Sequence, residues 1–375
     1  MIYFDNNATT RPDEVALQYA LERTLECYGN PSSTHKEGSF AANLLEDARG
    51  GLAKVIGCKA SELFFTSGGT ESNNIALKQS PGRTFVGQTE HSSVLNYPNS
   101  YVIKVLSDGT TDLDHLESEL LSYKKHSKSM GMVSIMLANN ETGVISDPGN
   151  RIPALCAEHG VLLHVDAVQG FGKDGAPWNV AGIRADMISV SAHKVHGPKG
   201  IGALYVREGV LPRLNAVLAG GRQERGLRPG TENIMGAIAF ARICWELDSE
   251  VYKQALARTS SLRNKLEEKL AGVTEINGGT AARIGNTSNL YFPEVTDVEL
   301  FVNTLSEKGL CVSGKSACNS GMPEPSRVLT AMYGGESPRL DGSIRMSLST
   351  KTTEREVDKA VEIIEETLHE LKDLF

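Results

Sequence analysis

The chain has 375 residues, of which 40% are hydrophobic and 22% are charged, and its formal net charge is −8. A hydrophobic share of this size can fill a large core and excludes disorder over most of the length, while the acidic balance argues against general nucleic-acid binding, which needs a basic surface. No run of about 18 apolar residues is present, and neither a signal peptide nor a C-x-x-C pair is visible, so we expect a cytoplasmic protein with reduced thiols and no membrane-spanning helix.

Through the first half of the chain, short apolar runs alternate with helical patterns. Strands are predicted at 63–66, 84–87, 101–104, 133–137, 161–165, 187–190 and 203–206, and helices at 39–56, 71–78, 112–123 and 152–158. The strands are apolar without alternation, which is typical of strands that are covered on both faces. Strand and helix in series predict an α/β fold with a mostly parallel, doubly wound sheet, in which ligands bind beyond the carboxyl ends of the strands.

A second pattern follows a long polar helical region predicted at 234–270. Strands at 286–292 and 343–347 and helices at 297–308 and 354–374 predict a smaller α+β domain. We place the boundary inside the long helix. The prediction is a large domain over 13–249 and a small domain made of 1–12 together with 250–375.

Polar groups follow the first predicted strands. Gly69 and Thr70 come after 63–66 and open a helix, so they can form a phosphate cup of backbone N–H groups, or simply a glycine-rich turn. His91 comes after 84–87 and can stack on an aromatic ligand or transfer protons, although a structural histidine is more common. Asn139 and Asn140 come after 133–137, where they can bind a ligand or form an Asx turn.

An acid and a lysine follow the next two strands. Asp166 ends an apolar strand, where a buried carboxylate needs a cation or donors, and a protonated ring nitrogen would supply one. Lys194 follows 187–190 and can act as an amine nucleophile, or lie at the surface with its stem on apolar neighbours. Pairing Asp166 with His164, or His193 with His196, as metal ligands leaves each pair without a third ligand. Acid, lysine and phosphate cup together are what pyridoxal phosphate requires, and they predict this cofactor.

Longer motifs extend this pattern from the first residues to near the last. They are FDNNATT at 4–10, TSGGTES at 66–72, TEH at 89–91, NNETG at 139–143, HVDAVQ at 164–169, SAHKVHGPKGIGALYVR at 191–207, RPGTEN at 228–233, SGKSACNSGMPEPSRVL at 313–329 and GSIRMSLS at 342–349. With these motifs the chain resembles the class V aminotransferase superfamily, and within it the cysteine desulfurases of the NifS/IscS type. The resemblance implies the fold type I of pyridoxal-phosphate enzymes.

The resemblance also implies roles for residues around the cofactor. Lys194 would form the Schiff base, Asp166 would pair with the pyridine nitrogen, and Gln169 would bond the phenolic oxygen. His91 would stack on the ring and shuttle protons. The phosphate and ring would be surrounded by Gly69, Thr70, Ser191 and His193, with Thr231 supplied by the second subunit of a homodimer.

For the substrate, L-cysteine, the resemblance implies three further contacts. Arg345 would clamp the carboxylate with the assistance of Asn289, and Asn140 would contact cofactor or substrate. A selenocysteine lyase, another C–S lyase or an aminotransferase of the same superfamily is the alternative, and a non-catalytic scaffold with this fold is a third reading.

Cys318 is the catalytic nucleophile that the resemblance implies. It would take sulfur from L-cysteine as a persulfide, leave alanine, and pass the sulfur to an acceptor or scaffold protein for iron–sulfur cluster assembly or for tRNA or cofactor thiolation. Its neighbours are small and polar and include Gly and Pro, which predicts a loop. Lys315 departs from the family pattern, which has Gly there. No resident metal is implied, but Cys318 is a candidate transient ligand of an iron–sulfur cluster.

Overall fold

The computed structural model describes residues 1–175, 177–211, 214–314 and 325–372. A central seven-stranded sheet has the order β2-β8-β7-β6-β5-β3-β4. Only β8 runs antiparallel to its neighbours β2 and β7, so the expected mostly parallel sheet is confirmed. The strands are β2 (Leu63–Thr66), β3 (Thr84–Gly87), β4 (Ser100–Ile103), β5 (Met132–Met136), β6 (Leu162–Asp166), β7 (Met187–Ser191) and β8 (Gly202–Val206).

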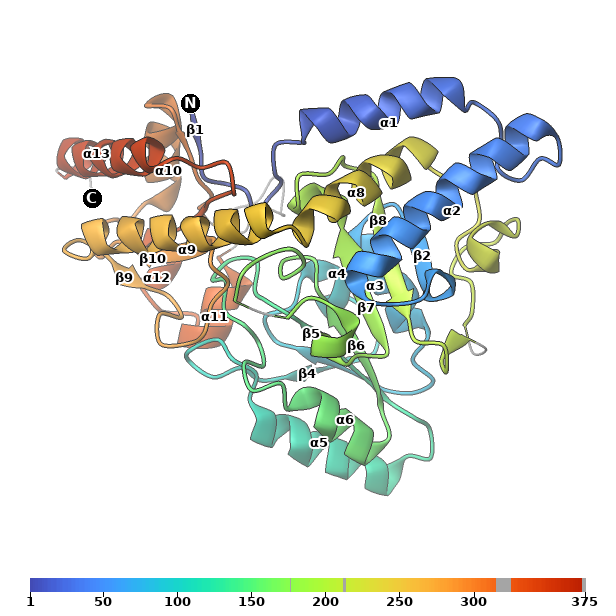
Figure 1. Ribbon diagram of the computed structural model, residues 1–375. Coiled ribbons are helices and arrows are strands. Elements are labelled where there is room, and N and C mark those ends of the chain that lie inside the picture. The colour runs from blue at the N-terminus through green and yellow to red at the C-terminus, as the bar shows by residue number, and fades with distance from the viewer. Residues whose placement is uncertain (176, 212–213, 315–324, 373–375) are drawn as a thin grey trace.

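Helices cover both faces of this sheet (Figure 1). They are α1 (Glu14–Glu26), α2 (Lys36–Ile56), α3 (Gly69–Lys78), α4 (Ser92–Leu95), α5 (Leu113–His126), α6 (Ile152–His159), α7 (Val180–Ile183) and α8 (Ile234–Leu247). For the helices that were predicted, most boundaries lie within three residues of those expected, but α1, α4 and α7 were not predicted.

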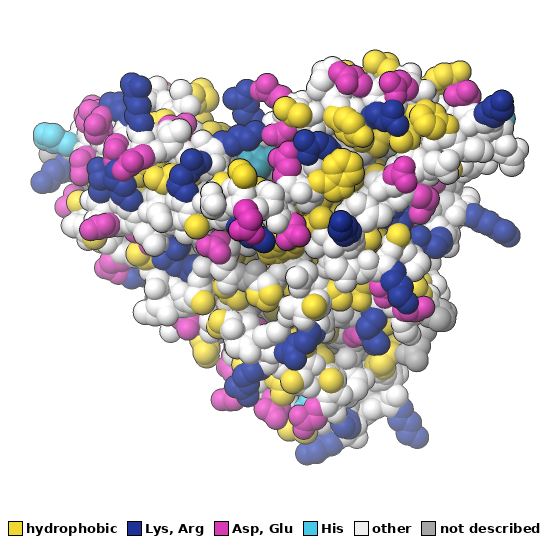
Figure 2. Space-filling model, viewed as in Figure 1, with side chains coloured by type: hydrophobic (Ala, Val, Ile, Leu, Met, Phe, Trp, Pro, Cys, Tyr) yellow, Lys and Arg dark blue, Asp and Glu magenta, His cyan; other side chains and the backbone are white. Residues whose placement is uncertain are grey.

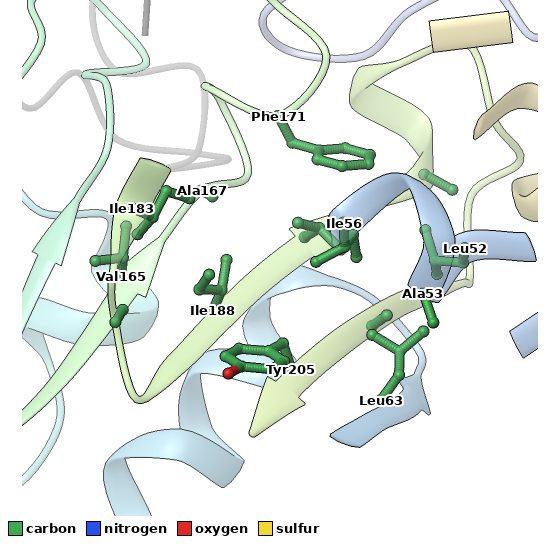
Figure 3. Close-up of a cluster of buried hydrophobic side chains, with 14 of the residues drawn as sticks. Leu52, Ala53, Ile56, Leu63, Val165, Ala167, Phe171, Ile183, Ile188 and Tyr205 are labelled. Carbon is green, nitrogen blue, oxygen red and sulfur yellow. The ribbon is translucent and has the colours of Figure 1, made fainter. Parts of the chain in front are cut away.

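Successive residues of each strand point to opposite faces, and both faces are apolar. Phe65, Leu163 and Ile188 join a core with α2 and α8, while the residue preceding each of them joins a second core with α3. Figure 3 shows the first core, where Leu52 and Ile56 of α2 lie over Ile188 and Tyr205 of the sheet. Burial on both faces explains why these strands lack polar alternation.

The predicted helix over 234–270 is two helices, α8 and α9 (Glu250–Leu270). Ser249 separates them, because its side chain accepts the Tyr252 N–H at 3.1 Å and caps the start of α9. The expectation of a polar helix holds for α9 and is wrong for α8, whose Ala237 and Phe240 are buried in the core.

Most of the remaining elements pack around a separate apolar cluster, and residues within 328–340 form a small cluster of their own. A three-stranded antiparallel sheet has the order β12-β10-β9, and β1 pairs with β11 in parallel. Ile2 and Phe4, at the beginning of the chain, lie in this cluster with residues from 262 onward. The elements are β1 (Ile2–Tyr3), β9 (Glu275–Ile276), β10 (Thr287–Tyr291), β11 (Leu310–Cys311), β12 (Ser343–Ser347), α9, α10 (Val298–Glu307), α11 (Arg327–Tyr333), α12 (Arg339–Gly342) and α13 (Glu354–Leu371).

The domain boundary at 249/250 stays a prediction, and the break between α8 and α9 falls at the same residues. In the part of the chain that the structure describes, no helix combines the length and the apolar character that a membrane crossing requires.

Candidate active site

A cavity of about 290 Å³ lies beyond the carboxyl ends of β5, β6 and β7. Its wall also receives the start of α3, the segment between β1 and α1, and β12 of the smaller sheet. Ten residues predicted from the sequence line it, namely Gly69, Thr70, His91, Asn140, Asp166, Gln169, Ser191, His193, Lys194 and Arg345. The expectation that ligands bind beyond the carboxyl ends of the strands therefore agrees with the position of this cavity.

Lys194 ends the short 3-10 turn that follows β7. Its Nζ donates hydrogen bonds to two backbone carbonyl oxygens, Asn7 O at 2.5 Å and Ala8 O at 2.9 Å. The lysine is thus held by neutral groups of the segment between β1 and α1, at the cavity wall. A side chain held in this way has its nitrogen in place to react with a ligand in the cavity.

Asp166 is the last residue of β6 and is buried. Its carboxylate accepts hydrogen bonds from Asn73 Nδ2 at 2.7 Å and from the Val168 N–H at 2.9 Å. Glu90 lies nearby and accepts the Met136 N–H. Burial, followed by the charge of Asp166, raises the pKa of Glu90 well above its usual value and favours its neutral form. Asp166, at the cavity wall, is the carboxyl group of the two that can meet a cationic ligand atom.

The start of α3 forms a cradle for an anion. Gly68 precedes it with φ 155° and offers no side-chain cap, which leaves the first N–H groups of the helix for a ligand. A Cβ at Gly69 would lie 2.7 Å from Val168, so glycine keeps this place open. Ser191 Oγ is buried without a hydrogen-bond partner among the described residues. These features, with Asp166 and Lys194, fit pyridoxal phosphate.

Two histidines stand in the cavity wall. His91 precedes α4, and its Nδ1 lies 2.8 Å from Ser93 Oγ and accepts the Ser93 N–H at 3.1 Å. His193 Nδ1 lies 3.2 Å from Thr9 Oγ1. Burial, assisted by the nearby charge of Lys194, lowers the pKa of His193 to about 4, so this imidazole is neutral at pH 7.

Arg345 of β12 reaches the cavity from the smaller sheet. Its Nη2 donates to Asp5 Oδ1 at 2.6 Å and to Ser313 Oγ at 2.9 Å, and its Nη1 donates to Asn140 O at 3.1 Å. The buried Nε has no hydrogen-bond partner among the described residues. A guanidinium braced in this way can bind a carboxylate in the cavity.

Two predicted residues, Asn289 and Thr231, are not among the residues that line the cavity, and a third, Cys318, is not described. Asn289 is buried opposite Arg345 in the β10–β12 pair, and its Nδ2 donates to Glu141 O at 3.2 Å. Thr231 is exposed. Cys318, like Lys315, lies outside the described residues.

Sequence reasoning missed other lining residues. Asn7 and Ala8 belong to the FDNNATT motif, but they follow no strand of the large sheet. Asn73 lies one helical turn after Gly69, a spacing that places both on the same side of α3. The others are Met136, Ala138 and Val168.

The structure does not support His164 as a metal ligand. Its Nδ1 lies 2.8 Å from Ser134 Oγ and its Nε2 lies 2.9 Å from Ser189 Oγ, so both ring nitrogens are occupied by hydroxyl groups. Burial lowers the pKa of His164 to about 4. It is a neutral histidine within the sheet.

Comparisons with known proteins give a consistent result. The model of the family "Aminotransferase class-V" matches residues 2–360. Cysteine desulfurase 2 of Trichormus variabilis is 40% identical, over 99% of this chain and 94% of its own length. A NifS-like protein from Rickettsia africae has a TM-score of 0.86 at 32% identity, with 98% of this chain and 99% of that chain covered. Another solved NifS-like protein has a TM-score of 0.86 at 35% identity, with coverage of 99% and 100%.

Proposed function

Since this chain belongs to the class-V aminotransferase family and is a pyridoxal-phosphate-dependent cysteine desulfurase, we propose that the cavity around Lys194 is the place where it binds cofactor and L-cysteine. The observation that carries this proposal is the meeting of four features in one cavity: Lys194, Asp166, the start of α3 and Arg345. Each matches a different part of the cofactor or the substrate.

The cofactor would be held at three points. Lys194 Nζ would bond covalently to it, Asp166 would pair with its ring nitrogen, and Gly69 and Thr70 would bind its phosphate at the start of α3. His91 would stack on the ring, and Gln169 would donate to the phenolic oxygen. When bound, pyridoxal phosphate supplies an electron sink that makes the α-proton of an amino acid acidic.

The chain's own residues would then direct the reaction. Arg345 would bind the carboxylate of L-cysteine and so fix the orientation of its side-chain sulfur. Lys194 Nζ, displaced by the substrate amine, would take the proton from the substrate Cα. His91 would move a second proton at the cavity wall.

We propose Cys318 as the sulfur acceptor. The described residues that flank its segment are both attached beside the cavity. Ser313 exchanges backbone hydrogen bonds with Arg345 at 2.7 and 3.2 Å, and Ser326 Oγ donates to Glu141 Oε2 at 2.5 Å. These two contacts beside the cavity support our proposal that sulfur passes from cysteine to the thiolate of Cys318, with alanine as the other product.

Mass spectrometry tests this assignment. Purified protein incubated with L-cysteine should gain the mass of one sulfur atom on the peptide that contains Cys318, with alanine released in equal amount. The variant Cys318→Ala should form neither persulfide nor alanine. Continued alanine formation by that variant would instead indicate a lyase or an aminotransferase.

We further propose that the protein is a homodimer that completes each cofactor site with Thr231 of its second copy. Apolar side chains are exposed on and beside α1, α2 and α8, among them Leu25, Tyr28, Phe40 and Trp245. Figure 2 shows yellow side chains gathered over α1 and α2 in the upper right of the view. An exposed apolar surface of this kind is typical of an interface between subunits.

The destination of the sulfur is the last part of the proposal. A cytoplasmic acceptor or scaffold protein would collect it from Cys318 for iron–sulfur cluster assembly, or for tRNA or cofactor thiolation. Incubation of the persulfide form with each class of acceptor, followed by mass spectrometry of the acceptor, separates these routes.

A further inference from the structure

A second lysine lies beneath the cavity without lining it. Lys173 is four residues after Gln169, in the turns that follow β6, and it is 7% exposed. Its Nζ donates to Gln169 Oε1 at 2.7 Å and to Asn7 Oδ1 at 2.9 Å. In the part of the chain that the structure describes, no carboxylate pairs with it. Both of these partners are neutral amide oxygens.

This arrangement fixes the orientation of two side-chain amides. An amide carries an acceptor oxygen and a donor nitrogen, and a lysine that binds the oxygen turns the nitrogen away. The nitrogen of Gln169, Nε2, accordingly donates to Asn7 O at 2.8 Å. The nitrogen of Asn7, Nδ2, donates to Thr287 Oγ1 at 2.8 Å and to Asn140 O at 3.2 Å.

The backbone oxygen of Asn7 joins this network to the reactive lysine. It accepts hydrogen bonds from both Gln169 Nε2 and Lys194 Nζ, at 2.8 and 2.5 Å. The two donors therefore lie side by side at the cavity wall. Lys173 contacts the residues on both sides of this arrangement. It binds the side chain of Gln169, which is one of the donors, and the side chain of Asn7, whose backbone oxygen accepts from Lys194.

We propose that Lys173 is a positioning residue that keeps the Gln169 amide turned with its N–H donor toward the phenolic oxygen of the cofactor. This inference rests on the proposed cofactor site. Without Lys173, the Gln169 amide is free to rotate and to present its oxygen to the cofactor oxygen, which replaces a hydrogen bond with a repulsion.

The surroundings of Lys173 are compatible with this role. Burial, followed by the charges of Lys194 and Arg345, lowers the pKa of Lys173 well below its usual value. A neutral amine still has two N–H donors, which is the number of hydrogen bonds that Lys173 makes here. The charged and the neutral form therefore hold both amides in the same orientation.

The test compares wild type with Lys173→Met, loaded with pyridoxal phosphate. The readout is the pH midpoint at which the visible absorption band changes, because a donor on the phenolic oxygen favours its anionic form and lowers this midpoint. We expect Lys173→Met to raise the midpoint by about one pH unit. Lys199→Met, which removes an exposed charge near His193, should leave the midpoint within a few tenths of a unit of wild type.

A double-mutant cycle decides whether Lys173 acts through Gln169. In the background of Gln169→Leu, the substitution Lys173→Met should no longer move the midpoint, since no amide remains to be oriented. A lower melting temperature with an unchanged midpoint would overturn the proposal and leave Lys173 a purely structural role. A shift of the same size in both backgrounds would also overturn it.

Two controls complete the design. If Lys173→Met does not fold, Lys173→Gln is measured against the same criteria, since its amide keeps N–H donors on a shorter side chain and should give a smaller shift. If the cofactor site itself is wrong, wild type will show no borohydride-fixed cofactor on the peptide that contains Lys194. That outcome is distinct from a normal wild-type band with no response to Lys173→Met.

Discussion

The carboxylate of Asp166 receives two hydrogen bonds from neutral donors, Asn73 and the Val168 backbone. These donors satisfy its oxygens but carry no charge, which fits the proposed pairing of this carboxylate with the ring nitrogen of the cofactor. We expect Asp166→Asn to lower the turnover of L-cysteine at least 100-fold, because the charge that stabilises the protonated ring is lost. Alanine release measures this. A decrease of less than tenfold would place the charge partner elsewhere.

Arg345 approaches the cavity with a planar, braced guanidinium. Replacing it with lysine keeps the charge but removes the fork that matches a carboxylate. We expect Arg345→Lys to raise KM for L-cysteine about 10- to 100-fold and to change kcat much less, in line with about 1–3 kcal/mol of lost binding. Steady-state kinetics measures both constants. An unchanged KM would show that another group binds the carboxylate.

His164 makes the stability of the protein depend on pH. Its pKa is lowered to about 4 in the folded state, from about 6.5 when unfolded, so the unfolded chain binds the proton more readily. The associated stability is fully present above pH 6.5 and is lost as the pH falls toward 4, to an extent of about 3 kcal/mol. Urea unfolding at pH 7 and pH 4.5 should show a smaller loss for His164→Gln than for wild type. Equal losses would contradict the prediction.

The site could be predicted where its residues follow strands of the large sheet. Lys194 and Asp166 come directly after apolar runs, and the strand-end rule then brings them to one cavity. Asn7 follows no such run, and nothing local in its sequence predicts that its carbonyl oxygen receives Lys194. Lys173 was missed because a single lysine is normally exposed, and only the folded chain shows its burial.

At the scale of elements, β8 comes very close to the loop that begins α3. A Cβ at Gly202 would lie 2.7 Å from Val190 O and 2.8 Å from Gly68 Cα. We expect Gly202→Ala to displace this loop, to destabilise the protein by about 1–3 kcal/mol and to weaken binding of pyridoxal phosphate. Thermal unfolding and cofactor titration measure the two effects.

Gly50 offers a matched control on the exposed side of α2. A Cβ there meets nothing within 4 Å, so Gly50→Ala should stabilise the helix by about 0.5–1 kcal/mol and leave cofactor binding unchanged. If Gly202→Ala behaves like Gly50→Ala, the close approach of β8 to the α3 loop has no bearing on the cofactor site.

The positions of the strands could be predicted from the sequence. The direction of β8 and the presence of some helices could not. The runs 63–66 and 84–87 match β2 and β3 because both are apolar and end at polar residues. The antiparallel direction of β8 follows from its connection to β7, which is too short for a parallel crossover. α1 was missed because only Ala16 and Ala20 of its residues are buried, which leaves little apolar periodicity.

For the whole molecule, similarity over nearly the full length confirms the resemblance to NifS/IscS-type cysteine desulfurases. The proposed homodimer also belongs to this scale. Leu25 and Tyr28 are 72% and 80% exposed at the end of α1 and just beyond it. On the proposed homodimer, we expect Leu25→Glu with Tyr28→Ser to shift the protein from dimer to monomer in sedimentation velocity. Cofactor retention should weaken as well, because the proposed contact from Thr231 of the second copy would be lost.

Val273 provides the control for that experiment. It is an apolar residue with 44% exposure after α9, away from the surface around α1. Val273→Ser should sediment like wild type. A double variant that still sediments as a dimer would place the subunit interface on another surface.

Asp5 and Arg345 pair at 2.6 Å although 340 residues separate them in the chain. Contacts between residues so far apart in sequence are costly in chain entropy and form slowly. The orientation of the guanidinium that we propose as the carboxylate clamp therefore depends on the packing of β12 against the segment between β1 and α1.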